Sequence, residues 1–327
     1  MSNVSDQFGR PFKYIRISVT DRCNFRCKYC MPDNNFKHLK CEEIMRYEDI
    51  LFAVSVFAEL GVNRVRITGG EPLVRAELPS FLQELTKING INEVMLTTNG
   101  ALLEKYAKDL AKAGVKRLNI SLDSLKPERN RFITGIDKDY NIINGIIKAK
   151  EEGLNPIKVN AVVIRDFNDD EIADFAELSA KLGIICRFIE FMPIGNVAEW
   201  SDKSIVKGDE IIERLAKFQP EKMARDKNTG PAVNYRLNNG GIIGIITPIS
   251  KHFCNDCDKL RLTSDGKIRP CLLSDNEIDL MPALKNRDKD GVINAIMQVL
   301  GSKHKEHNVS TDKEQKQFRR TMSKIGG

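Results

Sequence analysis

Three cysteines, Cys23, Cys27 and Cys30, stand close together near the start of the chain with the spacing C-x3-C-x2-C. A structural zinc site is closed by four ligands, whereas a four-iron cluster held by only three protein thiolates keeps one iron open for a small molecule. The count of three therefore favours a cluster whose open iron can do chemistry. Zinc ligation, or a redox pair beside an unrelated third cysteine, stays open from the spacing alone.

A second group of three cysteines lies late in the chain. Cys254 and Cys257 have the spacing C-x2-C, and Cys271 follows after thirteen residues. Taken by itself this group suits zinc and iron-sulfur equally, and His252 keeps zinc ligation open. Beside the first group, a second iron-sulfur centre becomes the better interpretation. The other two cysteines of the chain lie apart and are assigned no role.

The segment Gly69-Gly70-Glu71-Pro72 has residue types that suit ligand binding. Its glycines allow a ligand to lie against the backbone, and the carboxylate of Glu71 can accept hydrogen bonds from an ammonium group. A glycine pair after a strand is more commonly only a tight turn, so the neighbouring elements decide its meaning.

These groups are set in a regular alternation of short β-rich runs and longer amphipathic patterns. We expect strands at 14–19, 64–68, 93–97, 117–121, 158–164 and 185–191, and helices at 47–60, 76–88, 102–113, 140–152 and 170–182. Apolar strands separated by helices predict a parallel sheet covered by helices. Six strands are too few for a complete barrel, so we predict an α/β fold with an open, partial (β/α)6 barrel.

Ligands gather at the carboxyl ends of the strands in such folds. The first cysteine group follows the first expected strand, and the Gly69 segment follows the second. Thr97-Thr98-Asn99-Gly100 and Ser121-Leu122-Asp123 follow the third and fourth strands, so we expect all four segments to meet at one rim. After Met192 the pattern turns irregular, which predicts a barrel domain at 1–192 and a smaller α+β region at 193–327.

The first cysteine run, with the aromatic Tyr29 directly before its third cysteine, resembles the signature of the radical S-adenosylmethionine (SAM) enzymes. The resemblance implies a radical SAM barrel and a 4Fe-4S cluster on Cys23, Cys27 and Cys30, whose open iron binds SAM. The SAM contacts that it implies are Tyr29, Gly70, Glu71, Ser121 and Met192.

The second cysteine group, the charged residues after it and the terminal Gly326-Gly327 resemble one branch of this family, which opens molybdenum cofactor biosynthesis. The resemblance implies a lyase that converts GTP to (8S)-3′,8-cyclo-7,8-dihydroguanosine 5′-triphosphate. A radical made from SAM would take the 3′-hydrogen of GTP, and the ribose radical would add to C8 of guanine. A second 4Fe-4S cluster on Cys254, Cys257 and Cys271 would hold the guanine.

A triphosphate needs several cations that converge on it. The substrate contacts implied by the resemblance are Arg16, Arg66, Thr97, Lys158, Arg187, Lys259, Leu260 and Arg261, and catalytic roles are implied for Arg16, Gly326 and Gly327. Lys259-Leu260-Arg261 departs from the Arg-x-Arg pattern that is common in the family. Because lysine keeps the charge but loses the bidentate fork, we expect a weaker phosphate contact at Lys259.

The bulk composition suits a globular protein. The chain has 327 residues, of which 41% are hydrophobic, and no apolar run of membrane-spanning length. We expect a cytoplasmic protein without a membrane segment or a signal peptide. The net charge of +6 suits an anionic small molecule, and because a basic tail is most often simply solvated, we expect no nucleic acid.

The sequence is compatible with a homodimer and does not identify the electron donor. The resemblance implies that the product passes to the cyclic pyranopterin monophosphate synthase. Two alternatives are a peptide-maturing radical SAM enzyme, which usually carries more carboxy-terminal cysteines, and a zinc-bearing protein that binds nucleic acid. The zinc protein would be colourless, whereas iron-sulfur clusters would make the purified sample brown.

Overall fold

A computed structural model of the chain describes residues 4–31, 37–192, 200–224, 230–306, 320 and 322–325. Within them the strands form one sheet with the order β12-β11-β10-β1-β2-β3-β4-β5-β6-β9-β8-β7. The eight neighbouring strands from β10 to β9 are parallel, and an antiparallel hairpin continues the sheet on each side.

The strands have the following bounds: β1 (Tyr14–Ser18), β2 (Arg64–Thr68), β3 (Glu93–Thr98), β4 (Arg117–Ser121), β5 (Ile157–Val163), β6 (Ile185–Glu190), β7 (Glu221–Lys222), β8 (Val233–Arg236), β9 (Ile242–Ile246), β10 (Lys259–Leu262), β11 (Lys267–Arg269) and β12 (Ile278–Asp279). The helices are α1 (Tyr47–Glu59), α2 (Leu78–Thr86), α3 (Leu103–Lys112), α4 (Pro127–Thr134), α5 (Ile142–Glu151), α6 (Ile172–Leu182), α7 (Gly208–Arg214), α8 (Met281–Lys285), α9 (Lys289–Gly301) and α10 (Met322–Ile325).

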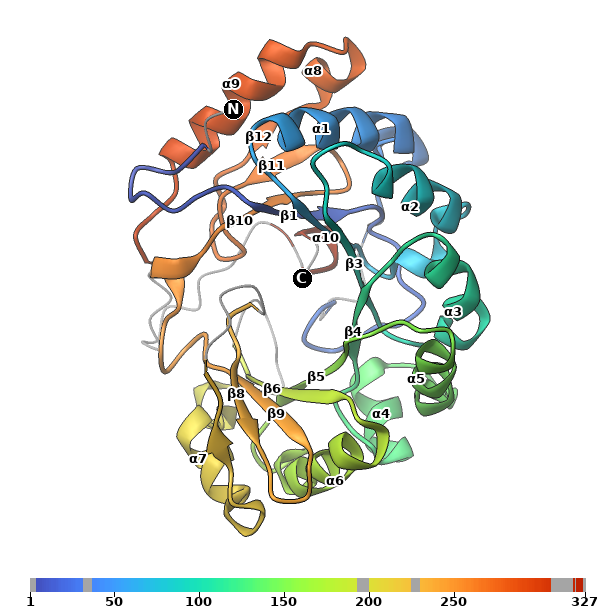
Figure 1. Cartoon of the computed structure of the whole chain (residues 1–327), viewed down its shortest axis with the longest axis vertical. Coiled ribbons are helices and arrows are strands. Elements are labelled where there is room, and N and C mark those ends of the chain that lie inside the picture. Colours follow the sequence, from blue (N-terminus) through green and yellow to red (C-terminus); the bar gives the residue numbers. More distant parts are fainter. Residues whose placement is uncertain are drawn as a thin grey trace.

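Alternation along the strands divides the sheet into two chemically different faces. Ile15, Ile17, Val65 and Ile67 are fully buried, and they belong to the hydrophobic core that also contains the apolar residues of the helices. The residues between them are polar or charged and share the opposite face. Figure 1 shows the strands as an incomplete ring with α1 to α6 on its outside, so the polar face lines the inside.

The predicted α/β class and parallel sheet are confirmed, and the incomplete ring is consistent with the partial barrel. The sequence predicted six parallel strands, and all six are present within two residues of their expected bounds. The carboxy-terminal region adds one parallel strand to each side, because β10 pairs with β1 and β9 pairs with β6. The domain boundary after Met192 stays a prediction.

Helix α4 was not expected. It begins with Pro127, which suits the first position of a helix because an N–H at that position would have no partner within the helix. It is closed after Thr134 by Gly135, which has the left-handed conformation with φ 64°. Its carboxyl end supports the first cysteine loop, because the backbone N–H groups of Arg26 and Lys28 donate to the carbonyls of Thr134 and Ile133 at 2.7 and 3.0 Å.

Candidate active site in the ring of strands

The first cysteine group lies on the loop after β1, as predicted. Cys23, Cys27 and Cys30 are partly buried. The N–H of Phe25 donates to Sγ of Cys23 at 3.3 Å, the kind of hydrogen bond that tunes iron-sulfur thiolates. Burial raises the pKa of Cys23 to about 11 and that of Cys27 well above its usual range. A cluster bound to these sulfurs would therefore have to supply the free energy that keeps them as thiolates.

The two glycines of the Gly69 segment hold this loop in place. The N–H of Gly70 donates to the carbonyl of Thr20 at 2.7 Å. A Cβ on Gly70 would lie 2.7 Å from the carbonyl carbon of Arg22, and one on Gly69 would lie 2.8 Å from the carbonyl oxygen of Thr20. The glycines are thus needed for close backbone packing between β2 and the cysteine loop. A SAM contact for Gly70 stays a prediction.

Glu71 ties two rim loops together. Its side chain is fully buried and accepts hydrogen bonds from the hydroxyl of Thr98 at 2.7 Å and from the N–H groups of Asn99 and Leu73 at 2.6 and 3.0 Å. Burial raises the pKa of Glu71 to about 7, although these hydrogen bonds oppose the rise. This arrangement explains the residue structurally, and its contact with an ammonium group stays a prediction.

The loops after the first four strands do meet at one rim. The side-chain amide of Asn99 donates to Oδ1 of Asn24 at 2.8 Å and lies 3.8 Å from Sγ of Cys23. Tyr29 donates its hydroxyl to Oδ2 of Asp123 at 2.7 Å. The predicted convergence of these segments is therefore confirmed.

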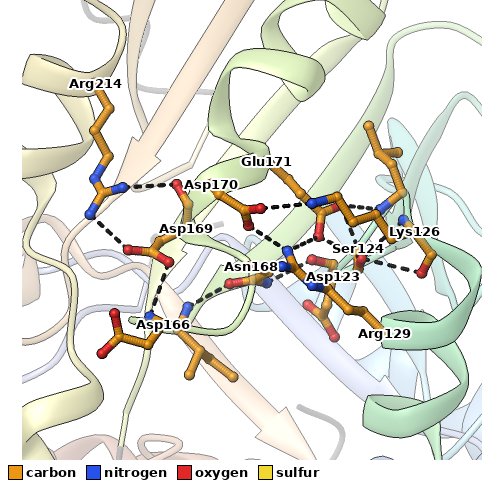
Figure 2. A network of polar contacts seen from close by, with 12 residues as sticks. Asp123, Ser124, Lys126, Arg129, Asp166, Asn168, Asp169, Asp170, Glu171 and Arg214 are labelled. Atoms are coloured by element: carbon orange, nitrogen blue, oxygen red, sulfur yellow. Dashed lines mark hydrogen bonds and ion pairs between the residues drawn. The ribbon is translucent and has the colours of Figure 1, made fainter.

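Asp123 was not predicted as a site residue, yet it orients Tyr29. Its Oδ1 accepts from the N–H of Val162 at 2.9 Å, and its carbonyl accepts from Asn168 at 2.7 Å. Burial raises its pKa to about 6. Figure 2 shows Asp123 beside Asn168, in a polar network that continues to Arg214. Its position directly after a strand, in Ser121-Leu122-Asp123, is the signal that could have identified it.

Ser121 and Met192 also lie towards this rim. Ser121 is the last residue of β4 and is the register partner of Asn160 on β5. Met192 is partly buried and follows β6. The structure therefore places both at the carboxyl ends of strands, and their contact with SAM stays a prediction.

The polar face of the sheet concentrates buried cations. Arg16 is the register partner of both Arg66 and Arg261. The side chains of Arg187 on β6 and Lys158 on β5 share this face. Except for Arg16, each of these five residues is at most 9% exposed. Five cations on one buried face are costly unless an anion neutralises them.

The neighbouring positive charges lower the pKa values of several of these cations. Burial and then the neighbouring Arg187, Arg117 and Arg66 lower the pKa of Lys158 to about 7. Burial and then Arg66 lower the pKa of Arg187. Burial and then Arg261 lower the pKa of Arg16. The predicted cations therefore converge, and their mutual repulsion makes this face suitable for an anion.

Tyr14 and Lys259 lie beside these cations, at the amino ends of β1 and β10. Nε of Arg66 donates to the hydroxyl of Tyr14 at 2.5 Å, and Nζ of Lys259 lies 5.3 Å from the centre of its ring. Lys259 also pairs with Asp258 at 2.9 Å. Leu260, by contrast, is fully buried in the hydrophobic core. Its side chain therefore faces away from the cations, and only its backbone can meet a nucleotide.

Neutral hydrogen-bonding groups share the polar face. Thr97 and Asn119 are register partners, and Asn160 and Asn234 lie farther along the sheet. Their Oγ1 and Oδ1 atoms are buried without a hydrogen-bond partner among the described residues. Buried polar atoms need partners, so these four suit a ligand with hydroxyl or amide groups. Of them only Thr97 was predicted, although polar residues at every second strand position were a signal for the others.

The second cysteine group lies at the opposite end of the strands. Cys254 and Cys257 precede β10, which runs parallel to β1, whereas Cys23 follows β1. Cys271 follows β11, which runs antiparallel to β10 and so returns to the same end. At about 3.3 Å per residue, the five-residue β1 separates the two ends by roughly 16 Å.

The donor set at this end also fits a cluster with thiolate ligands. All three cysteines are partly buried, and the N–H of Leu273 donates to Sγ of Cys271 at 3.4 Å. Within the described ranges, no three His, Cys, Asp or Glu side chains are arranged to hold a single metal ion. The assignment of both groups as cluster ligands therefore rests on residue type, spacing and placement.

The carboxy-terminal segment is anchored close to the rim of the first cysteine group. Arg320 donates to both carboxylate oxygens of Asp265 at 3.0 and 2.9 Å and to Glu277 at 2.8 Å. Ile325 in α10 is 3% exposed, and α10 projects within the ring of strands in the view of Figure 1. The predicted catalytic residues Gly326 and Gly327 lie outside the described residues.

Comparisons with known proteins identify the families that the chain resembles. The Radical SAM superfamily model matches residues 17–179, and the Molybdenum Cofactor Synthesis C model matches residues 184–309. The GTP 3′,8-cyclase of Alkaliphilus oremlandii is 42% identical over 99% of this chain and 100% of its own length. That of Moorella thermoacetica is 44% identical over 99% of this chain and 100% of its own length.

Solved structures show the same fold at low sequence identity. Streptococcus suis SuiB bound to its precursor peptide SuiA is 16% identical with a TM-score of 0.63, over 89% of this chain and 68% of SuiB. The enzyme anSMEcpe with bound AdoMet is 18% identical with a TM-score of 0.57, over 87% of this chain and 81% of its own. These two likenesses show the fold alone, so they do not favour the peptide-maturing alternative.

Among the described residues, no helix is both long and apolar enough to cross a membrane. The polar, cationic inner face and the two cysteine groups at its ends agree with the full-length match to the curated relatives. The chain therefore belongs to the GTP 3′,8-cyclase family of the radical SAM superfamily.

Proposed function

We propose that the protein converts GTP to (8S)-3′,8-cyclo-7,8-dihydroguanosine 5′-triphosphate, the first step of molybdenum cofactor biosynthesis. The observation that carries the proposal is the set of buried cations between the two cysteine groups. Its relatives are named for this reaction, and a nucleoside triphosphate is an anion of the size and charge that such a face needs.

The cations on the polar face bind the triphosphate. Arg16, Arg66 and Arg261 are register neighbours on three adjacent strands, so their guanidinium groups form a continuous surface for phosphate oxygens. Lys158 and Arg187 approach from β5 and β6 and hold the triphosphate from a second side. This binding relieves the repulsion among the cations. Since the strands fix the positions of these residues, the site is organised for its ligand before the ligand arrives.

Two clusters serve the two ends of this site. Cys23, Cys27 and Cys30 hold one 4Fe-4S cluster, and Cys254, Cys257 and Cys271 hold the other. When bound, the first cluster and SAM supply the radical that abstracts the 3′-hydrogen of GTP, and the second orients the guanine. This residue set leaves one iron without a protein thiolate at each end.

The protein's own residues position the cofactor and the substrate. Tyr29, held by Asp123, presents its ring from the cysteine loop, and Gly70, Glu71, Ser121 and Met192 surround SAM. Arg16 lies in the middle of β1, which leads into the first cysteine loop, so it contacts the triphosphate close to the reacting ribose. The side-chain oxygens of Thr97, Asn119 and Asn160, which have no hydrogen-bond partner in the part of the chain that the structure describes, bind ribose hydroxyls.

The carboxy-terminal Gly326 and Gly327 complete the site in this proposal. Arg320 brings the chain to the rim of the strands through its ion pairs with Asp265 and Glu277. The absence of side chains then allows close approach to the substrate.

The remaining parts of the proposal concern the cell. A cytoplasmic location fits six cysteines that must stay reduced for cluster assembly. The protein acts as a homodimer, and its product passes to the cyclic pyranopterin monophosphate synthase. The predicted division into a barrel domain at 1–192 and a region that completes the substrate site at 193–327 belongs to the same proposal.

The test is anaerobic reconstitution with iron and sulfide, followed by SAM, dithionite and GTP. We expect 5′-deoxyadenosine and the cyclised nucleotide in equal amounts. ATP in place of GTP is the control and yields no cyclised product. Formation of 5′-deoxyadenosine without any cyclised nucleotide in the presence of GTP would contradict the proposal.

A further inference from the structure

Lys303, which follows α9, is buried against the second cysteine group. It is 5% exposed, and its ammonium donates to the carbonyls of Cys257 at 2.7 Å and Lys259 at 3.1 Å. These two carbonyls flank the turn that leads from the cysteines into β10. Both of these hydrogen bonds go to neutral carbonyls, so they leave the positive charge of the lysine available to its surroundings.

The groups around Lys303 fix its position from several sides. Gln7 donates to its carbonyl at 2.9 Å. Arg10 donates to the carbonyls of His304 at 2.8 Å and Lys305 at 3.1 Å, and also to that of Cys254 at 2.8 Å. Asp6 holds Arg10 in turn at 2.6 Å. The amino-terminal segment therefore clamps the segment after α9 onto the loop that carries the cysteines.

The ammonium of Lys303 lies at the second cysteine group, because its hydrogen bond to the carbonyl of Cys257 holds it beside that residue. The charged side chains of Arg10 and Asp6 also lie here, and they are paired with each other. A buried ammonium beside thiolates stabilises negative charge on them, since the local dielectric constant is low.

We propose that Lys303 is a positioning residue for the second cysteine group, which fixes the turn at Cys257 and raises the reduction potential of the cluster there. The inference rests on the proposed function, because it takes this group as a cluster site. A fixed positive charge favours the reduced cluster, which carries one more negative charge, so its loss must lower the potential. The same charge lowers the cost of gathering three thiolates in a buried place.

The test uses the full-length chain with Cys23, Cys27 and Cys30 replaced by alanine, so that only the second group can bind iron. In this background K303Q keeps a hydrogen-bond donor but loses the charge, and K303R keeps the charge. K305Q is the matched control, because Lys305 is exposed two residues away and its loss changes the net charge equally. The readouts are iron content and the midpoint potential from an anaerobic titration followed by electron paramagnetic resonance.

We expect K303Q to have a more negative midpoint potential than K305Q, with K303R close to the unsubstituted background. If K303Q binds no iron, the result for K303R decides. Retention of iron by K303R, with the midpoint potential of the background, supports the proposal. Loss of iron in both variants overturns it. Equal potentials in K303Q and K305Q also overturn it while leaving the two-cluster assignment intact. A background that binds no iron at all refutes the two-cluster assignment, and the inference with it.

Discussion

Lys158 gives the anion site a pH dependence whose size follows from the structure. In the free protein, burial and neighbouring cations hold its pKa at about 7. A bound triphosphate supplies the missing negative charge, so the pKa returns towards its ordinary value near 10.5. GTP binding must therefore be accompanied by proton uptake between these two pH values, and GTP must bind more weakly as the pH rises.

The magnitude follows from simple titration. With a free pKa of about 7, Lys158 is roughly half deprotonated at pH 7 and roughly nine-tenths deprotonated at pH 8. GTP binding should then take up about 0.5 proton at pH 7 and about 0.9 at pH 8. If only the protonated lysine binds well, the affinity falls about 50-fold between pH 7 and pH 9. The second pKa of a phosphate monoester lies near 6, so the terminal phosphate of GTP is mostly ionised over this range.

The assay is anaerobic calorimetry of GTP binding to the reconstituted protein without SAM, in buffers of different ionisation enthalpy. The slope of the observed binding enthalpy, plotted against the ionisation enthalpy of the buffer, gives the number of protons taken up. K158R is the matched control. Its guanidinium stays charged at every pH tested, so most of the proton uptake on GTP binding should be lost. Proton uptake that is absent at pH 8, or equal in K158R and the unsubstituted protein, would show that Lys158 does not take up a proton when GTP binds.

Three further predictions address other parts of the site. Gly244→Ala places a Cβ 2.9 Å from both Cγ of Arg187 and Oδ1 of Asn234, so losing one charged hydrogen bond of about 1.5–3 kcal/mol should weaken GTP binding roughly 10- to 150-fold. Gly301→Ala, which meets no atom within 4 Å, should leave the calorimetric affinity unchanged, and an equal loss in both variants would contradict this account. Arg320→Ala removes the ion pairs of the carboxy-terminal segment and should weaken its docking by about 1.5–3 kcal/mol. Cyclisation should then slow while iron content and GTP affinity stay constant, and an unchanged rate argues against a docked tail. Gly70→Ala displaces the first cysteine loop, so iron per chain should fall to about half with GTP binding retained; full iron content would show that the glycine is not needed there.

Local patterns in the sequence predict the parallel sheet well because strands such as β1 and β2 alternate between a core face and a polar face. Ile15, Ile17, Val65 and Ile67 mark the core face, and the intervening Arg16 and Arg66 could be assigned to the site from that pattern alone. Short separations between motif and strand also place the first cysteine group correctly at the carboxyl end of β1. These features depend on neighbours in sequence, which is why they can be read directly.

Other features depend on pairing between distant segments. The position of the second cysteine group follows from the parallel pairing of β10 with β1, about 240 residues apart in the chain, which no local pattern encodes. The core position of Leu260 follows from the same pairing. Glu71 has the residue type of a ligand contact, yet three hydrogen bonds from the rim loops occupy it. Lys303 is one lysine among many in a basic region, and only the fold brings it to Cys257.

In the proposed function, the two cysteine groups serve one reaction on a nucleotide held between them. Its most direct test is turnover of GTP that carries deuterium at the 3′-carbon, with mass spectrometry of the 5′-deoxyadenosine released. We predict that one deuterium appears in 5′-deoxyadenosine and that none remains at the 3′-position of the cyclised product. Unlabelled 5′-deoxyadenosine, formed alongside a product that keeps its deuterium, would contradict the account.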